Sequence, residues 1–393
     1  MLLEMASCTN ASFSRRSFLS TLISGAAGLS LPTPLSSRGA NEESFAFGLL
    51  GDLHFDRLKH HELEWLEREK PDDLRQVRDY SRITADILPQ LFARLRETLA
   101  ELSSSPNRLA FLIQVGDLVE GLCGNENLAR QQNTEAVEFL RATGPDVPLL
   151  FTKGNHDVTG AGAPEAFKAV FHPFLGAQAA QLKGPEKLTS ARYTVQQGEA
   201  LFCFYDAYDK ESLGWLEAAL ARRTARHCFL VIHPPVVPYG ARSTWHIFSG
   251  EREKVQRGHL LELLGKHNVL VLSGHIHKFN LLARTTPGGG KFLQVALSSV
   301  ISSAPVQPRS LLSGVSQYTP DQVKVEAAFS PATEQARRAV YESERDLVRY
   351  FQYADLPGYA IVKVNGPHVT LDMYSGFTSQ LWRTVDLTQV LAG

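Results

Sequence analysis

Cysteine is scarce in this chain, with four residues in 393. Cys8 lies near the N-terminus, and Cys123, Cys203 and Cys228 are spread over the remainder. So few cysteines exclude a disulfide framework, although one bridge stays open. Because Cys203 and Cys228 lie in apolar, strand-like segments, we interpret both as small buried hydrophobic side chains.

Net charge is also slight. The 40 basic and 41 acidic residues leave a formal charge of −1 at pH 7. This balance gives no electrostatic case for binding a long nucleic acid, whereas free nucleotides are not excluded. A hydrophobic content of 44% is ordinary for a globular protein, and the length suits one large domain or two ordinary ones.

The apolar run near the N-terminus, residues 22–29, is too short to span a bilayer. It follows Arg15 and Arg16 and precedes a stretch of small residues and prolines. This is the plan of an export signal, and the paired arginines resemble the twin-arginine class. The alternative is a disordered basic tail.

We therefore expect residues 1–40 to be a signal peptide, cleaved between Ser36 and Asn41. The mature protein is then exported to the periplasm or beyond, without a membrane anchor. Its predicted catalytic domain is 41–304, followed by an extension over 305–393.

Five apolar, strand-like runs are each followed by polar residues that can bind metals. The polar residues are Asp52 and His54, Asp117, Asn155 and His156, His233, and His275 and His277. Each fragment alone is weak evidence, because a turn-forming Asp or a solvent-facing His is common. Five such fragments in one chain are specific.

The segments between the first three runs, 72–102 and 125–143, have helical spacing. The resulting β-α-β-α-β order predicts a parallel sheet, whose carboxyl ends are where ligand sites gather. His60, His61 and Trp65 lie in a segment that we expect to be a solvated loop, with the rim of a substrate cleft as the alternative. The fold class is therefore α/β.

Beyond residue 305 the sequence predicts a helix over 332–351 and a hairpin from 359–364 and 369–374. We expect this extension to pack on the second sheet of the same domain.

The five fragments match, in order, the blocks D-x-H, G-D, G-N-H-D/E, H and G-H-x-H. The chain resembles the calcineurin-like metallophosphoesterase superfamily over roughly residues 45–300, with no ligand position substituted. The resemblance implies a four-layer αββα sandwich of two mixed β-sheets flanked by helices. It also implies two metal sites that share one bridging carboxylate. One site comprises Asp52, His54, Asp117 and His277, and the other comprises Asp117, Asn155, His233 and His275.

Oxygen and imidazole donors suit two transition-metal ions, Mn, Fe or Zn, better than Mg²⁺. The resemblance implies hydrolysis of a phosphodiester or small phosphomonoester by a metal-bound hydroxide. It gives His156 a role in leaving-group protonation or phosphate orientation, with Asp157 orienting His156. A turn cap is the alternative role for Asp157.

The chain departs from the protein Ser/Thr phosphatases of the superfamily, because Leu118–Gly121 lacks their Arg-Gly and Asp157 replaces their Glu. A small phosphate ester is therefore the expected substrate, with Trp245 and His246 as predicted contacts. Two alternatives remain: a scaffold that keeps the fold without catalysis, and a nucleotide-directed hydrolase of the same superfamily.

Overall fold

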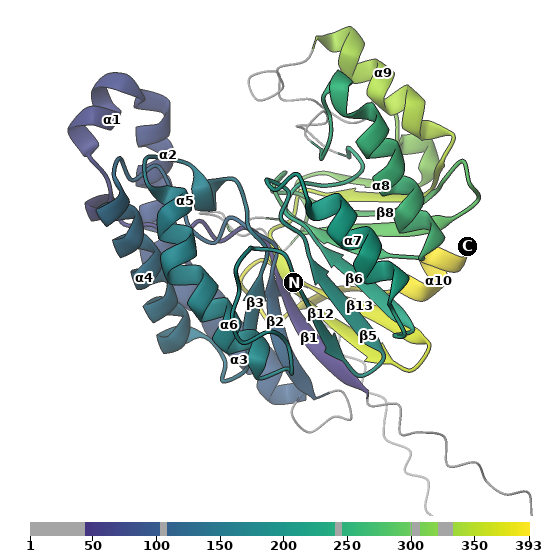
Figure 1. Ribbon diagram of the computed structural model, residues 1–393, viewed down its shortest axis with the longest axis horizontal. Helices are drawn as coiled ribbons and strands as arrows, with labels where there is room; N and C mark the ends of the chain where they lie inside the picture. The colour runs from purple at the N-terminus through teal and green to yellow at the C-terminus, as the bar shows by residue number, and fades with distance from the viewer. Residues whose placement is uncertain (1–43, 103–107, 240–245, 299, 301–306, 321–332) are drawn as a thin grey trace, which may run out of the picture. The chain divides into compact units, whose positions relative to one another are not determined.

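Two mixed β-sheets form the centre of the protein, with helices on their outer sides (Figure 1). The structure is a computed structural model that describes residues 44–102, 108–239, 246–298, 300, 307–320 and 333–393. Within these residues, six strands make the first sheet and eight the second.

The first sheet has the order β14-β13-β12-β1-β2-β3. Its β1, β2 and β3 run parallel, whereas β12, β13 and β14 are antiparallel to their neighbours. The strands are β1 Phe45–Leu50, β2 Leu109–Gln114, β3 Leu149–Phe151, β12 Gly358–Asn365, β13 His368–Ser375 and β14 Leu381–Asp386.

The second sheet has the order β10-β11-β8-β9-β7-β6-β5-β4. Here β5, β6, β7 and β9 run parallel, and the remaining pairings are antiparallel. The strands are β4 Tyr193–Gln197, β5 Ala200–Phe204, β6 His227–Val231, β7 Leu270–Ser273, β8 Phe279–Thr285, β9 Lys291–Ala296, β10 Leu311–Ser313 and β11 Val348–Ala354.

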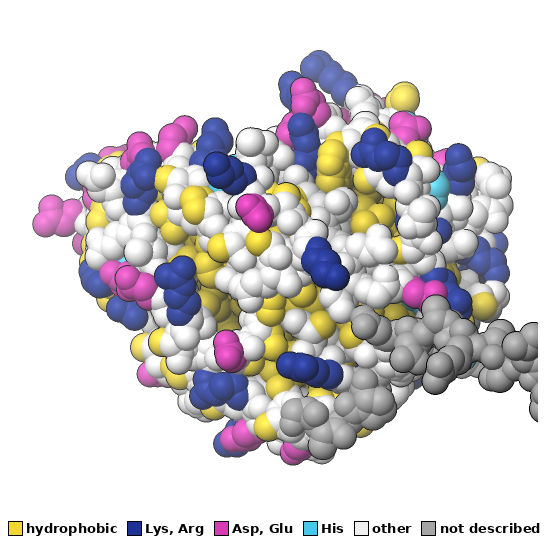
Figure 2. Space-filling view, turned by 60° about the horizontal axis from the view of Figure 1, so that its bottom comes forward, with side chains coloured by type: hydrophobic (Ala, Val, Ile, Leu, Met, Phe, Trp, Pro, Cys, Tyr) yellow, Lys and Arg dark blue, Asp and Glu magenta, His cyan; other side chains and the backbone are white. Residues whose placement is uncertain are grey.

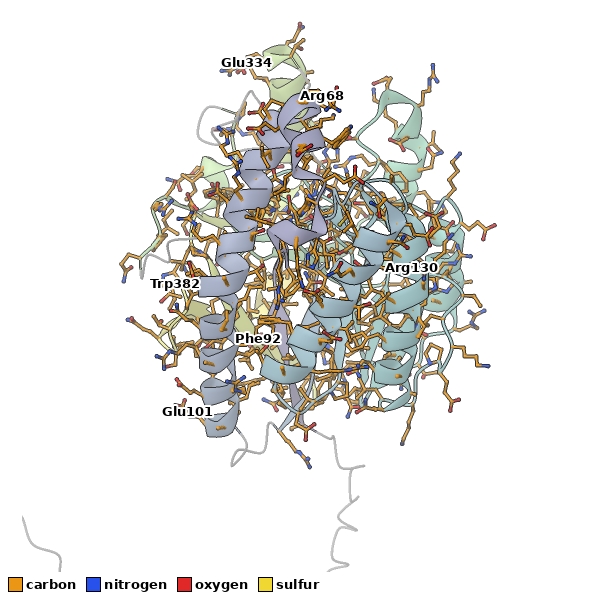
Figure 3. All side chains as sticks on the ribbon, turned by 90° about the vertical axis from the view of Figure 1, so that its left-hand side faces the viewer. Arg68, Phe92, Glu101, Arg130, Glu334 and Trp382 are labelled. Carbon is orange, nitrogen blue, oxygen red and sulfur yellow. The ribbon has the colours of Figure 1, made fainter. Side chains whose placement is uncertain are left out.

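Helices α3, α4 and α6 lie beside the first sheet, and α7 and α8 lie beside the second (Figure 1). In Figure 3, Phe92 of α3 lies between α3 and α4, where its ring meets Phe139 edge-on. The helices are α1 Leu63–Glu69, α2 Pro71–Asp86, α3 Leu88–Leu102, α4 Glu126–Thr143, α5 Ala163–Ala166, α6 His172–Ala180, α7 Ser212–Ala221, α8 Lys254–Lys266, α9 Glu334–Arg345 and α10 Leu387–Ala392.

Phenylalanines from the two sheets interdigitate in the core. Phe47 of β1 stacks on Phe111 of β2 at 5.5 Å between ring centres. Across the interface it meets Phe202 and Phe229 edge-on, at 5.2 and 5.4 Å. All four rings are fully buried, so the contact joins the sheets with both apolar area and favourable ring geometry.

The expected fold class is confirmed, because two mixed sheets flanked by helices constitute an αββα sandwich. The helix predicted over 72–102 is instead two helices, α2 and α3, which meet at Ile87. Pro89 explains the break, since proline lacks the N–H that a continuous helix would need there.

The C-terminal extension differs from expectation in two ways. The predicted helix over 332–351 ends at Arg345, and Val348–Ala354 forms β11, where aromatic and β-branched residues pair with β8. The predicted hairpin is present as β12 and β13, but it pairs with β1 in the first sheet rather than the second. The extension thus supplies strands to both sheets, and the division at residue 305 stays a prediction.

Replacing Phe47 by Ala should destabilise the fold by about 3–5 kcal/mol, because a cavity would open between the sheets. Urea unfolding monitored by circular dichroism measures the change. Leu381→Ala is the control, because Leu381 is 49% exposed and should change stability by no more than about 0.5 kcal/mol. Equal stability of the two variants would contradict the role of the aromatic core.

Candidate metal centre

The carboxyl ends of the parallel strands bring the polar fragments together. Leu50 pairs with Gln114, and Gln114 pairs with Phe151, so β1, β2 and β3 end at the same level. Asp52, Asp117 and Asn155 therefore emerge at one edge of the first sheet.

The second sheet meets this edge through backbone contacts. The Gly274 N–H donates to the His233 carbonyl at 3.0 Å, which holds the ends of β6 and β7 together. The His275 N–H donates to the Asp52 carboxylate at 3.0 Å, so a residue after β7 contacts a residue after β1. The site is thus shared by both sheets.

A first group of side chains comprises Asp52, His54, Asp117 and His277, whose potential ligand atoms lie within 4.8 Å of one another. The Nε2 atoms of His54 and His277 are 3.2 Å apart. Asp52 Oδ2 lies 3.0 Å from His277 Nε2, and Asp117 Oδ2 lies 3.9 Å from His54 Nε2. These donor atoms therefore face a common point.

A second group comprises Asp117, His233 and His275. His233 Nε2 lies 3.0 Å from Asp117 Oδ2 and 3.1 Å from His275 Nδ1. The amide oxygen of Asn155 is 3.2 Å from the same His233 nitrogen. The two groups share the Asp117 carboxylate, and all seven residues predicted as metal ligands belong to them or border them.

The backbone at this site is strained. His54, Asp117, His275 and His277 have φ angles of 47°, 56°, 71° and 59°, in the left-handed region that residues other than glycine rarely adopt. Such conformations cost on the order of 1–3 kcal/mol each and cluster at functional sites. Four of them among seven candidate ligands favour a site shaped by function.

Two glycines allow the segments to approach each other. A Cβ atom on Gly274 would lie 2.1 Å from Asp52 Oδ1, and one on Gly154 would lie 2.1 Å from Asp117 Oδ1. Neither position can carry a larger residue without moving a candidate ligand.

Burial and charge oppose one another in the cluster. Burial alone would raise the pKa of Asp117, but the neighbouring His233 and His156 imidazoles hold that pKa well below its usual value. Burial would lower the pKa of His233, whereas the Asp117 carboxylate raises it to about 9. Burial lowers the pKa of His54 well below its usual value. The buried carboxylate therefore requires positive charge beside it.

His156 adjoins the first group. Its Nδ1–H donates to the Glu120 carbonyl at 2.8 Å, which leaves Nε2 as the nitrogen available for substrate. Burial opposes protonation of His156, but the Glu120 and Asp117 carboxylates outweigh burial and raise its pKa. A proton-donating role is consistent with this environment.

The carboxylate of Asp157 accepts backbone hydrogen bonds from Gly154, Asp117 and Val119 at 2.8, 3.1 and 3.1 Å. These bonds tie the second fragment to the third. The described hydrogen bonds of this carboxylate favour a turn-capping role over orientation of the His156 ring.

Glu120 is the main site residue that sequence reasoning missed. It is fully buried, and its Oε2 lies 2.8 Å from His54 Nδ1 and 3.6 Å from His156 Nδ1. Gln76 of α2 donates to its other oxygen at 2.7 Å. Burial raises the pKa of Glu120 to about 8. Its position three residues after Asp117 was the available signal.

The segment before α2 was also misjudged. His60 and His61 are buried rather than solvated. Asp56 accepts hydrogen bonds from His61 Nε2 at 2.6 Å and from Gln132 of α4 at 2.7 Å. This segment is therefore attached to α4, one of the helices beside the first sheet. Tyr80 of α2 stacks on His54 with ring centres 4.2 Å apart. Helix α2 thus borders the site through Gln76 and Tyr80.

The predicted substrate contacts are only partly described. Trp245 lies outside the described residues. His246 is buried, and the adjacent Ile247 N–H donates to the Pro235 carbonyl in the segment after His233. Contact of either residue with substrate stays a prediction.

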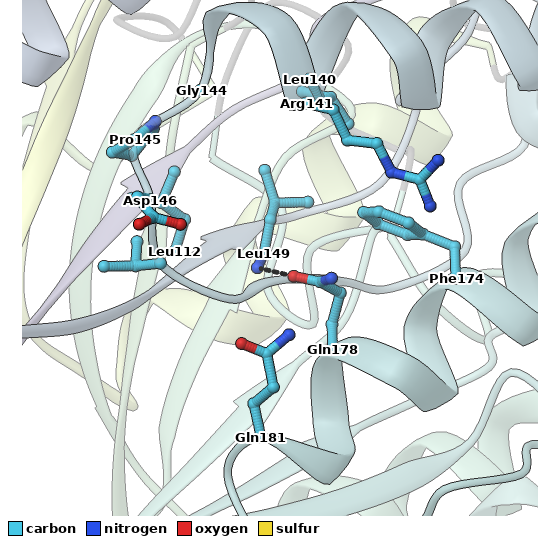
Figure 4. A pocket seen from close by; sticks show the side chains of 11 residues that line it. Leu112, Leu140, Arg141, Gly144, Pro145, Asp146, Leu149, Phe174, Gln178 and Gln181 are labelled. Atoms are coloured by element: carbon cyan, nitrogen blue, oxygen red, sulfur yellow. Dashed lines mark hydrogen bonds between the residues drawn. The ribbon is translucent and has the colours of Figure 1, made fainter.

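A cavity of about 380 Å³ at the amino end of β3 is separate from these groups (Figure 4). Its wall includes Arg141, Phe174 and Gln178, and the Gln178 side chain accepts from the Leu149 N–H. No residue of the metal groups lines it. It is therefore not a candidate for the reaction site.

The three described cysteines are free and buried. Cys203 and Cys228, on neighbouring strands, lie side by side as thiols, as their interpretation as small core residues requires. In the described part of the chain, no helix combines the length and apolar character needed to cross a membrane.

Comparison with known proteins agrees with the geometry. A family model described as calcineurin-like phosphoesterase matches residues 45–279, more than half of the chain. The serine/threonine-protein phosphatase CPPED1 of Danio rerio is 31% identical over 83 residues. That match spans 21% of this chain and about a quarter, 26%, of the relative's length.

A structure of PhoD matches 88% of this chain and 69% of its own, with 12% identity and a TM-score of 0.49. Purple acid phosphatase PPD1 from Lupinus luteus matches 87% of this chain and 53% of its own, with 11% identity and a TM-score of 0.46.

The family match covers all five fragments that converge in the candidate metal centre. The chain therefore belongs to the calcineurin-like phosphoesterase family.

Proposed function

We propose that this protein is a two-metal phosphoesterase that hydrolyses a phosphodiester or a small phosphomonoester. The observation that carries the proposal is the Asp117 carboxylate, which lies between two groups of imidazole and oxygen donors. One ion would be held by Asp52, His54, Asp117 and His277, and the other by Asp117, Asn155, His233 and His275.

The donor set fits transition-metal ions such as Mn, Fe or Zn. Four imidazoles, two carboxylates and one amide match their ligand preferences better than those of Mg²⁺. The imidazole nitrogens of His54 and His277 lie 3.2 Å apart, and those of His233 and His275 lie 3.1 Å apart. A cation bound by both nitrogens of a pair would stabilise this close approach. When bound, two such ions activate water and stabilise negative charge on the phosphate.

The surrounding residues would orient the ligands and manage protons. The His233 Nδ1–H donates to the Val115 carbonyl, which turns Nε2 toward Asp117. Glu120 would orient His54, because its Oε2 lies 2.8 Å from Nδ1, a close approach without hydrogen-bond geometry that leaves Nε2 toward the cluster. His156 would protonate the departing oxygen of the substrate or orient the phosphate.

The partner is proposed to be a small phosphate ester rather than a long nucleic acid. On the face drawn in Figure 2, Lys and Arg side chains are interspersed with Asp and Glu rather than gathered into one basic patch. This distribution agrees with the near-zero net charge of the chain.

Asp117→Asn should abolish turnover of a chromogenic phosphodiester and of the matching monoester by the manganese-loaded protein. It should also reduce the bound metal from two ions per chain, because the shared carboxylate loses its charge. Colorimetric rates and metal analysis by mass spectrometry measure the two effects. Unchanged turnover in the variant would contradict the proposal and favour a scaffold.

Glu120→Gln should lower metal affinity by about 10- to 100-fold, because it weakens the group that orients His54. Calorimetric titration with Mn²⁺ measures this affinity directly. Glu97→Gln is the matched control, since Glu97 is exposed on α3 and pairs with Arg94. Equal affinity in Glu120→Gln and the wild-type protein would exclude the orienting role.

We further propose that residues 1–40 direct export through a twin-arginine signal, which the sequence alone supports. Expression of the full chain with its signal should yield a periplasmic protein that begins between Ser36 and Asn41. N-terminal sequencing of the exported fraction provides the test. An intact Met1 in that fraction would refute cleavage, and Arg15→Lys with Arg16→Lys should keep the protein inside the cell.

A further inference from the structure

A second cavity, of about 570 Å³, lies beside the candidate metal centre. Lys153 and Val158 belong to its wall and flank the turn that carries Asn155 and His156. The cavity therefore adjoins the turn that carries these two residues. Its volume falls in the range that accommodates small organic ligands. The wall also includes Phe167, His172, Asp206 and Tyr208.

Tyr208 is a large aromatic side chain in the cavity wall that remains partly exposed to solvent. It is 46% exposed. Partial burial of the ring, together with the charges of Asp117 and Asp157, raises the pKa of its phenol well above the usual value. The side chain thus belongs to the cavity wall, and much of its surface is accessible to a ligand.

Asp206 holds Tyr208 in place. The Asp206 carboxylate accepts the Tyr208 backbone N–H at 3.0 Å and pairs with the Lys153 ammonium at 2.5 Å. Lys153 Nζ in turn lies 5.8 Å from the ring centres of both Phe167 and Tyr208. The backbone of Tyr208 is therefore fixed by Asp206, and its ring lies beside the Lys153 ammonium.

Several charges at this wall are paired with one another, and Lys168 and Lys210 add further positive charge. The positive charge of Lys153 is compensated by Asp206. Arg192 pairs with both Asp209 and Glu211, so these acidic groups are compensated as well. The wall also presents the half-exposed ring of Tyr208 to a ligand, and such a ring can stack on a flat partner.

We propose that Tyr208 and this cavity bind a planar aromatic substituent of the phosphate ester while its phosphate lies at the metal centre. This inference rests on the proposed phosphoesterase function, since the metal centre anchors the phosphate. The substituent is an aryl group or a nucleobase, which share a flat π surface. Tyr208 is thereby a specificity-determining residue.

Calorimetric binding of phenylphosphonate and methylphosphonate to the manganese-loaded protein tests the proposal. Wild-type protein should bind phenylphosphonate roughly 2- to 10-fold more tightly, as expected for one aromatic contact. Tyr208→Ala should abolish this preference, and Tyr208→Phe should retain it because the ring is kept. Leu381→Ala is the control, since Leu381 is exposed on β14 outside the cavity. A nucleoside 5′-phosphonate in the same series distinguishes the sources, because the tighter of the two aromatic ligands identifies a nucleobase or an aryl group.

The subsite is overturned if Tyr208→Ala keeps the preference, if wild-type protein shows none, or if neither phosphonate binds. Its failure can be distinguished from failure of the proposed function. Hydrolysis of phosphate esters without an aromatic preference rejects the subsite alone. An aromatic preference that requires Tyr208, in a protein that hydrolyses no phosphate ester, rejects the catalytic proposal and leaves the subsite supported.

Discussion

The arrangement of the candidate metal centre depends on positive charge beside buried carboxylates. Asp52, Asp117, Glu120 and Asp157 are all almost fully buried within a few residues of the strand ends. An isolated buried carboxylate is costly, and each must be neutralised, hydrogen-bonded or paired. Asp157 is satisfied by backbone amides, but Asp117 faces imidazoles on both sides. Bound cations would complete this compensation, and the strained backbone at four candidate ligands is consistent with a site that sacrifices stability for function.

The fold meets this need by joining two sheets at one edge. The Phe47 contacts hold the sheets together in the core, and the hydrogen bond from His275 to Asp52 joins them at the site. The C-terminal strands contribute indirectly to the site, because β12 pairs with β1 in the first sheet and β11 pairs with β8 in the second. Residues far apart in sequence are thus brought to within hydrogen-bond distance by strand pairing rather than by local turns.

Much of the site could be predicted from the sequence because apolar runs followed by Asp, Asn or His are visible without alignment. The helix break at Ile87 was missed because amphipathic spacing continues through Pro89. Strands β8, β10 and β14 were missed because they depend on pairing partners distant in sequence. Glu120 and His60 were missed because their burial arises from α2 and α4 packing over them. Tyr208 carries no local pattern, and only the neighbouring Lys153 and Asp206 reveal its position.

The most direct test of the account is a crystal structure of the manganese-loaded protein with anomalous scattering measured for the metal. The account predicts two peaks about 4 Å apart, with Asp117 bridging them and the seven candidate ligands around them. A single peak, or two peaks that do not share Asp117, would contradict the account.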